Sequence, residues 1–247
     1  MLTVIINAFQ SIKNILPTNN GQRSKICLRI HDFYGKVNRT QHQSPKQSLR
    51  IAIEELGNNT IETSLAVIND LEQIAQNHAQ YHWIIMGILT TFIRENAPYM
   101  PQEKLTSNLS TKLRVDIQAA LTVIARRDVN KDPENEQLDL SHTDIRGANL
   151  NRANLEQTNL YQANLAGANL TEANLAGAIL SAANLESTNL YLANLEGAIL
   201  SAASLKGANL EGANLHCASL YLAVLNGAVL NDAILDGANL REAKFSE

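Results

Sequence analysis

Residues 148–167 read ANLNR ANLEQ TNLYQ ANLAG, which is one five-residue unit written four times. Counted from Leu140, a Leu or another apolar residue recurs at every fifth position up to Phe245, so that 22 pentapeptides follow one another without a gap. A fixed short period is typical of a solenoid, whose units bury their apolar side chains only by stacking on one another. Ala stands two positions before the central residue in 18 of the 22 units, and the exceptions are Leu138, Thr143, Thr158 and Thr188.

Neither a helix nor a plain strand can carry this pattern. In a helix, a period of five turns the apolar position by about 140° at each unit, and in a strand successive Leu residues would face opposite sides. A chain that turns a corner once per pentapeptide keeps every Leu and Ala inside and directs the other three residues to water. Gly occupies the second position after the centre in eight units, from Gly147 to Gly237. A type II turn needs a positive φ at this position, so we predict a turn in every unit.

Units such as Ala148-Asn149-Leu150 and Ala163-Asn164-Leu165 resemble the pentapeptide-repeat family, whose motif is A(D/N)LXX. The resemblance implies a right-handed quadrilateral β-helix with four units per coil, Leu and Ala inside and Asn or Asp outside. Residues 138–247 would then form about five and a half coils, roughly 26 Å long at a strand spacing of about 4.8 Å. The expected fold class is an α+β two-part chain, with an N-terminal all-α domain ahead of this β-helix.

The abrupt change of pattern near residue 137 predicts a helical capping domain over 1–130, a linker over 131–137 and the β-helix over 138–247. The open first coil has unpaired backbone groups, which such a domain would cover. The segment resembles the helical region ahead of the repeats in many bacterial members of the family, through stretches such as residues 52–57, 71–75 and 92–95. Helices are expected over 23–36, 49–56, 61–75, 79–95 and 113–127, with a polar linker over 37–47 and a capping box of Asn59 and Glu62.

Residues 1–16 are apolar but interrupted by polar residues, and they lack a basic start and a small-residue cleavage site. We interpret them as an amphipathic docking helix rather than a signal peptide. No run of 18 apolar residues exists, so a membrane is not an expected partner. Cys27 and Cys217 lie far apart and form no disulfide framework, which favours a reducing, cytoplasmic location.

Charge is divided unevenly between the two parts of the chain. Residues 138–247 hold 11 acidic and five basic residues, a net charge of −6, whereas residues 1–137 hold 13 acidic and 15 basic ones. Nucleic acid is therefore not an expected partner, because a phosphate backbone requires a basic face. Some proteins of the resembled family bind type II topoisomerases by imitating DNA, and this is the alternative function. Six net charges over roughly 26 Å disfavour it, because a DNA duplex carries two per about 3.4 Å.

The sequence predicts no catalytic, cofactor-binding or metal-binding residues. His78 and His82 are four residues apart, a spacing that places both on one face of a helix and that metal sites use, but no further ligand accompanies them. His216 and Cys217 are adjacent, so their side chains should diverge, and no third group orients them. We therefore expect a non-enzymatic scaffold that binds another protein.

Residues 20 apart should lie in one column on successive coils, and one such region loses its charges. There, Ile replaces the usual Asn at outward positions, and contiguous apolar surface favours contact with an unidentified protein. The alternative is drift, since β-branched residues are tolerated on a sheet. This region, called here the uncharged strip, comprises Ile179, Ile199, Ser181, Ser201, Ala182, Ala202, Tyr161 and Tyr221.

A second group of outward positions turns aliphatic near the C-terminus. We call Leu222, Val224, Val229 and Ile234 the C-terminal girdle, because they should surround the last full coil. Two explanations remain open. The girdle could form a homodimer contact, or it could stiffen a terminal coil.

Overall fold

A computed structural model describes residues 44–56, 60–99 and 113–245 of the chain. The helices expected over 1–16 and 23–36 lie outside the described residues, as do Cys27 and Asn59. The chain divides into two compact units, Met1–Glu54 and Glu55–Glu247. All the contacts between elements discussed below lie within the second unit.

Helix α3, Pro45–Leu56, begins inside the segment that we expected to be a linker over 37–47. The Ser44 hydroxyl oxygen accepts a hydrogen bond from the backbone N–H of Gln47 at 3.3 Å. Proline is well suited to the first helical position, because the N–H that it lacks has no partner there. The predicted linker therefore extended too far, since Pro45 starts a helix instead of interrupting one.

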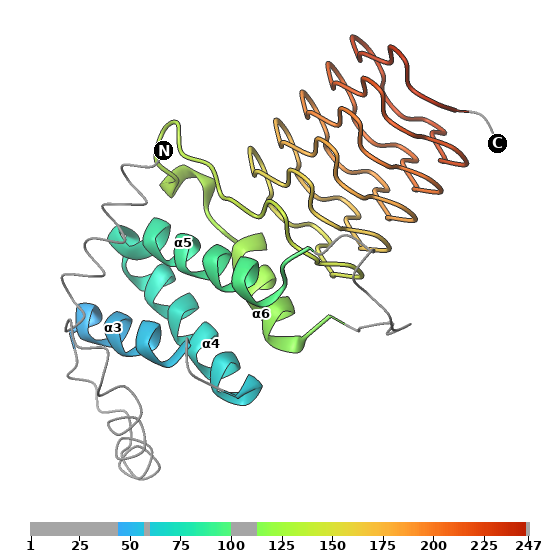
Figure 1. Cartoon of the computed structure of the whole chain (residues 1–247). Coiled ribbons are helices and arrows are strands. Elements are labelled where there is room, and N and C mark those ends of the chain that lie inside the picture. Colours follow the sequence, from blue (N-terminus) through green and yellow to red (C-terminus); the bar gives the residue numbers. More distant parts are fainter. Residues whose placement is uncertain (1–43, 57–59, 100–112, 246–247) are drawn as a thin grey trace. The chain divides into compact units, whose positions relative to one another are not determined.

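Three further helices, α4 (Ile61–Asn77), α5 (Ala79–Asn96) and α6 (Val115–Ala125), pack against one another, and the short 3₁₀ helix η2 (Val129–Lys131) follows them (Figure 1). The predicted capping box of α4 was wrong. The N-cap residue is Thr60, whose hydroxyl accepts a hydrogen bond from the N–H of Thr63 at 3.4 Å. The core of the helices consists of fully buried apolar side chains, among them Leu71, Ile85, Leu89, Ile93, Ile117 and Leu121.

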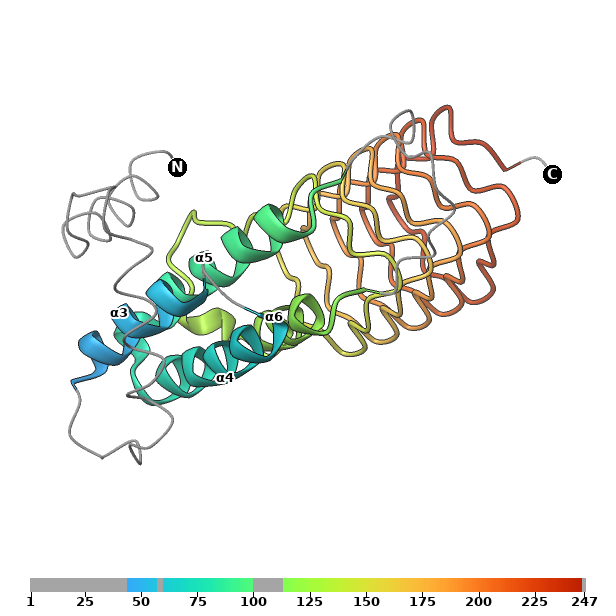
Figure 2. The same cartoon turned by 60° about the horizontal axis from the view of Figure 1, so that its bottom comes forward.

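From Leu138 onward the chain winds as stacked coils, which Figures 1 and 2 show in yellow to red. Parallel β-bridges join residues 20 apart, from Asp139 and Asn159 at one end to Val224 and Lys244 at the other. The bridges recur every five residues along the chain, so each coil contains four of them. They are isolated bridges, and the described part of this region forms no longer strands. Because the chain turns once in every five residues, each side of the coil is too short to form a longer strand.

A turn separates consecutive bridges, and its geometry does not depend on glycine. In the unit centred on Ile145, for example, the N–H of Ala148 donates to the carbonyl of Ile145 at 3.2 Å, and Gly147 between them has φ +66°. Every fifth residue from His142 to Glu242 has a positive φ, and these residues include non-glycine ones such as Ala182. A left-handed residue is costly outside glycine, so the stacking of neighbouring coils must compensate for it.

Leu and Ala fill the interior, and the three Thr residues that replace Ala are buried as well. The Thr143 hydroxyl donates to the Leu140 carbonyl at 2.7 Å, and the Thr188 hydroxyl donates to the Leu165 carbonyl at 3.2 Å. The interior therefore accepts a hydroxyl only where a backbone carbonyl satisfies it.

The Asn residues do not simply face water, contrary to the expectation from the repeat. Most are half-buried and Asn164 is buried, because their side chains bond to the turn that follows. The Oδ1 atom of Asn194, for example, accepts the N–H of Glu196 at 3.3 Å. The same side chain donates to Asn174 at 3.1 Å and accepts from Asn214 at 3.1 Å. Asn thus fixes both the turn and the alignment of adjacent coils.

Candidate interaction surfaces

The first coil has no preceding coil to pair with, and the helices supply the missing partners. The N–H of Asp144 donates to the carbonyl of Ala97 at 2.7 Å, and the N–H of Asn154 donates to that of Ala125 at 2.8 Å. Ala97 and Ala125 stand at the ends of α5 and α6, where helix carbonyls lack partners of their own. The carbonyl groups at the helix ends and the N–H groups of the first coil, which would otherwise lack partners, therefore form hydrogen bonds with each other at this junction.

Gln118 pairs with the backbone of the first coil through its side chain. Its Oε1 atom accepts the N–H of Asn149 at 2.8 Å, and its Nε2 atom donates to the carbonyl of Asn149 at 2.9 Å. The side-chain amide thereby reproduces the pair of hydrogen bonds that another strand would make.

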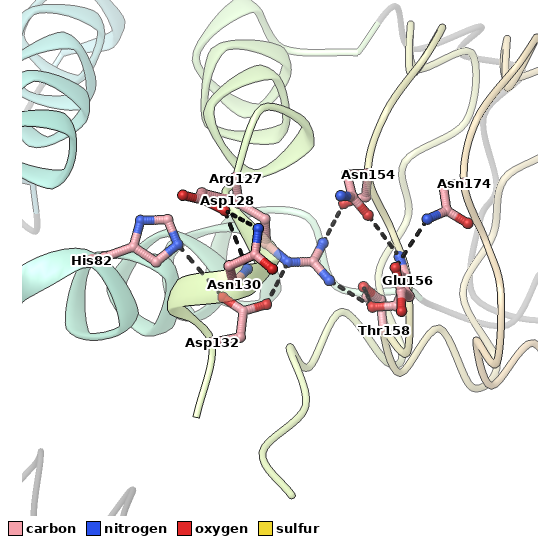
Figure 3. Close-up of polar contacts among 9 residues, drawn as sticks. All are labelled: His82, Arg127, Asp128, Asn130, Asp132, Asn154, Glu156, Thr158 and Asn174. Carbon is pink, nitrogen blue, oxygen red and sulfur yellow. Dashed lines mark hydrogen bonds and ion pairs between the residues drawn. The ribbon is translucent and has the colours of Figure 1, made fainter. Parts of the chain in front are cut away.

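Arg127 completes the junction, as Figure 3 shows. Its guanidinium group donates to the backbone carbonyls of Asn154 and Glu156 and, through Nε, to the carboxylate of Asp132 at 2.9 Å. Only 2% of the Arg127 side chain and 15% of the Asp132 side chain are exposed, so this ion pair is largely removed from water. Further along the solenoid, the equivalent carbonyls accept hydrogen bonds from the preceding coil, for example that of Tyr161 from His142.

His82 lies beside this cluster, with its Nε2 atom 3.5 Å from Oδ1 of Asp132 (Figure 3). Neither atom has a hydrogen-bond partner. His78 does not share a helical face with His82, because it forms the break between α4 and α5. In the described part of the chain, no group of three or more His, Cys, Asp and Glu residues could hold a metal ion.

The structure brings the residues of the uncharged strip together. Bridges connect Asn159 with Ile179, Ile179 with Ile199, and Ile199 with Ser219, so these four side chains form one column. Ile199 is 41% exposed and Tyr161 39% exposed, whereas Ile179 is half-buried. The corner beside this column carries the remaining strip residues, of which Ala182 and Ala202 are exposed and Ser181, Ser201 and Tyr221 are half-buried.

Some charged side chains on the other corners form ion pairs between adjacent coils. Arg152 donates to Glu172 at 2.9 Å on the next coil, and Lys206 lies 3.7 Å from Glu186. The hydrogen bonds from Arg152 to Glu172 raise the pKa of the arginine. These pairs lie outside the uncharged strip, whose own residues carry no charge.

The residues of the C-terminal girdle belong to different columns, because Val224, Val229 and Ile234 bridge to Ser204, Asn209 and Asn214. Leu222, Val229 and Ile234 are exposed, and Val224 is half-buried. Its role as a contact stays a prediction.

Sequence reasoning missed one exposed apolar pair, Tyr191 and Leu192, of which 37% and 48% are exposed. Both follow Leu190 at a corner, and the interruption of the polar pattern there could have revealed them. His216 and Cys217 do approach each other, with Nε2 and Sγ 3.4 Å apart. Among the described helices, none combines the length and the apolar character needed to cross a membrane.

A coil of five-residue units, each with an interior Leu and a turn, defines a β-helical solenoid, and its sequence matches a known family. The family model of pentapeptide repeats matches residues 139–177, 178–216 and 218–247, as eight copies. No curated protein matches the chain.

Solved structures of the same family match the solenoid. The pentapeptide repeat protein Rfr23 from the cyanobacterium Cyanothece 51142 is 34% identical over 45% of this chain and 88% of its own, with a TM-score of 0.43. HetL from Nostoc sp. strain PCC 7120, a protein involved in heterocyst differentiation regulation, is 37% identical over 42% of this chain, with a TM-score of 0.32. The match spans 60% of the HetL chain. The fluoroquinolone resistance protein QnrB1 is 20% identical over 42% of this chain and 56% of its own, with a TM-score of 0.25.

The chain therefore belongs to the pentapeptide-repeat family, and its coils form a β-helix with parallel bridges between residues 20 apart. The helical residues ahead of it lie outside the family match.

Proposed function

We propose that the protein is a non-enzymatic interaction module in the cytoplasm, whose β-helix presents the uncharged strip to a protein partner. The observation that carries this proposal is the column of Ile179 and Ile199, which are adjacent on successive coils at a position otherwise held by polar residues. Exposed apolar side chains aligned in this way lose contact with water when a partner covers them.

The helical residues take the role of a cap in this proposal. Their hydrogen bonds to Asp144, Asn149 and Asn154 occupy the backbone groups that would otherwise attract another strand. Contacts at the strip then become more specific, because the competing edge of the first coil is closed.

Imitation of DNA is the alternative, and the distribution of charge disfavours it. Acidic residues such as Glu172 and Glu186 are paired with Arg152 and Lys206 rather than left as a continuous negative surface. Duplex DNA, in contrast, carries an uninterrupted series of phosphate charges.

A pull-down from bacterial cytoplasmic lysate tests the proposal. The wild type is compared with Ile179→Lys/Ile199→Lys, and the matched control is Tyr191→Lys/Leu192→Lys, which places the same charges at an exposed apolar pair outside the strip. A protein that the wild type and the control retain and the strip variant loses supports the proposal. If all three retain the same proteins, the strip is not the contact.

A further inference from the structure

The column of Ile179 and Ile199 lies between two corners of different chemistry. On one side, the residues that directly follow the central Leu of each unit are mostly hydrogen-bond acceptors, and we call this corner the acidic edge. On the other side, the equivalent residues are mostly donors, and we call this corner the donor edge. The acidic edge comprises Glu156, Ala176, Glu196, His216 and Asp236, and the donor edge comprises Tyr161, Ser181, Ser201, Tyr221 and Arg241.

Each residue of the acidic edge stands level with the donor-edge residue five positions later, within a quarter of a coil. Glu156 is thus level with Tyr161, Glu196 with Ser201, and Asp236 with Arg241. Asp236 and Arg241 are both exposed, and neither has an ion pair within the described part of the chain. Their charges are therefore available to another molecule.

We infer that the partner of the uncharged strip is a second copy of this chain, bound side by side with its solenoid parallel to the first. This inference rests on the contact role proposed above. A two-fold axis parallel to the solenoid places the acidic edge of each copy against the donor edge of the other, at the same level. Glu196 then meets Ser201 of the second copy, and Asp236 meets Arg241 of the second copy.

The same axis brings the Ile column against its own counterpart. Ile179 and Ile199 of one copy face Ile179 and Ile199 of the other, which removes four apolar side chains from water. Small Ser and Ala residues beside them allow the two surfaces to approach. A two-fold contact requires a self-complementary surface of this kind.

The antiparallel arrangement fails on charge. A two-fold axis across the solenoid would place the acidic edge of one copy against the acidic edge of the other. Glu156, Glu196 and Asp236 would then face like charges without a cation, which is unfavourable at an interface.

The contact is small. Five levels about 4.8 Å apart span roughly 19 Å along the solenoid, and only one face of the coils takes part. We therefore expect dissociation constants in the micromolar range and a dimer that weakens with salt, because the Asp236 and Arg241 charges are screened.

Sedimentation of the purified full chain alone, over a series from about 1 μM to about 1 mM at low salt, tests the inference. Three variants accompany the wild type. Ile179→Ser/Ile199→Ser removes the apolar column and should fold, because Ser204 and Ser219 already occupy equivalent positions. Asp236→Arg places arginine against arginine in both symmetric pairs, and Asp236→Arg/Arg241→Asp restores opposite charges across the axis.

We expect a dimer for the wild type, association at least roughly tenfold weaker for the Ser variant and for Asp236→Arg, and near wild-type association for the charge swap. Circular dichroism of the dilute monomers verifies folding. A wild type that stays monomeric throughout overturns the inference and leaves the lysate experiment to decide the proposed function. A dimer that the Ser variant preserves, or that the charge swap fails to restore, also overturns it.

Discussion

Replacement of Arg127 by Met is the sharpest test of how the helices hold the first coil. The substitution keeps an unbranched apolar stem and removes the guanidinium group of a side chain that is only 2% exposed. Asp132 then loses the partner of its carboxylate, and the carbonyls of Asn154 and Glu156 lose their donors.

The loss should be large. Removal of one partner from a buried ion pair costs about 3–5 kcal/mol, and a buried carbonyl without a donor costs about 1–3 kcal/mol. These terms overlap, because the junction can open and admit water. We therefore expect the free energy of unfolding to fall by about 3–5 kcal/mol, a large share of the roughly 5–15 kcal/mol typical of a domain.

Urea unfolding followed with two probes provides the assay. Trp83 is the only tryptophan and lies in α5, so its fluorescence reports the helices, whereas far-ultraviolet circular dichroism reports the whole chain. In Arg127→Met, the urea midpoint of the Trp83 fluorescence should fall below the midpoint of the circular dichroism signal.

The neighbouring arginine is the matched control. Arg126 is 68% exposed on its side chain and lies 3.5 Å from Glu72, so Arg126→Met should cost less than about 1 kcal/mol. Equal losses for the two variants, both below about 1 kcal/mol, would refute the role assigned to Arg127.

Three further predictions concern the coils and the 3₁₀ turn. Gly212→Ala and Gly197→Ala should each destabilise the fold by about 1–2 kcal/mol in urea unfolding, because both residues have a positive φ and the Cβ at Gly212 would meet only the movable end of the exposed Leu192 side chain; a much larger loss for Gly212→Ala would contradict this. Asn194→Ala should cost about 1–3 kcal/mol, since it removes three hydrogen bonds, whereas Asn184→Ala removes the one bond to the Glu186 N–H and should cost less; the reverse order in thermal unfolding would count against the Asn ladder. Hydrogen bonds from the Asn130 side chain and backbone lower the pKa of Asp128, so this carboxylate stabilises the fold above its unfolded pKa and the contribution is lost as the pH falls through the folded value. An NMR titration should give a midpoint below about 3.9 that rises in Asn130→Ala, and an unchanged midpoint in that variant would exclude the proposed cause.

The five-residue period predicted the interior of the coils, because burial of Leu and Ala imposes that period directly. Gly147 and its equivalents likewise indicated the turn, since a positive φ leaves a signature in composition. Four units per coil came from the family resemblance, because a period of five does not reveal how many corners close a coil. From that register, the alignment of Ile179 with Ile199 followed.

The junction with the helices could not be predicted from the sequence. Gln118 and Arg127 bond to coil residues 31 and 27 positions away, and nothing local distinguishes them from other polar residues on a helix. Pro45 also misled the prediction, because proline both ends and begins helices. The burial of Asn164 was not predicted, because Asn is a polar residue that usually faces solvent. Here its Oδ1 atom accepts a hydrogen bond from the N–H of Ala166 in the next turn.

The pairing of residues 20 apart separates what folding requires from what the surface requires. Loss of one pentapeptide between Ile179 and Ile199 would preserve every interior Leu and Ala, but it would move Ile199 to the neighbouring column. Loss of four pentapeptides would keep both the interior and the columns. Stability therefore tolerates any length change in steps of five, whereas a surface that spans several coils tolerates only steps of twenty.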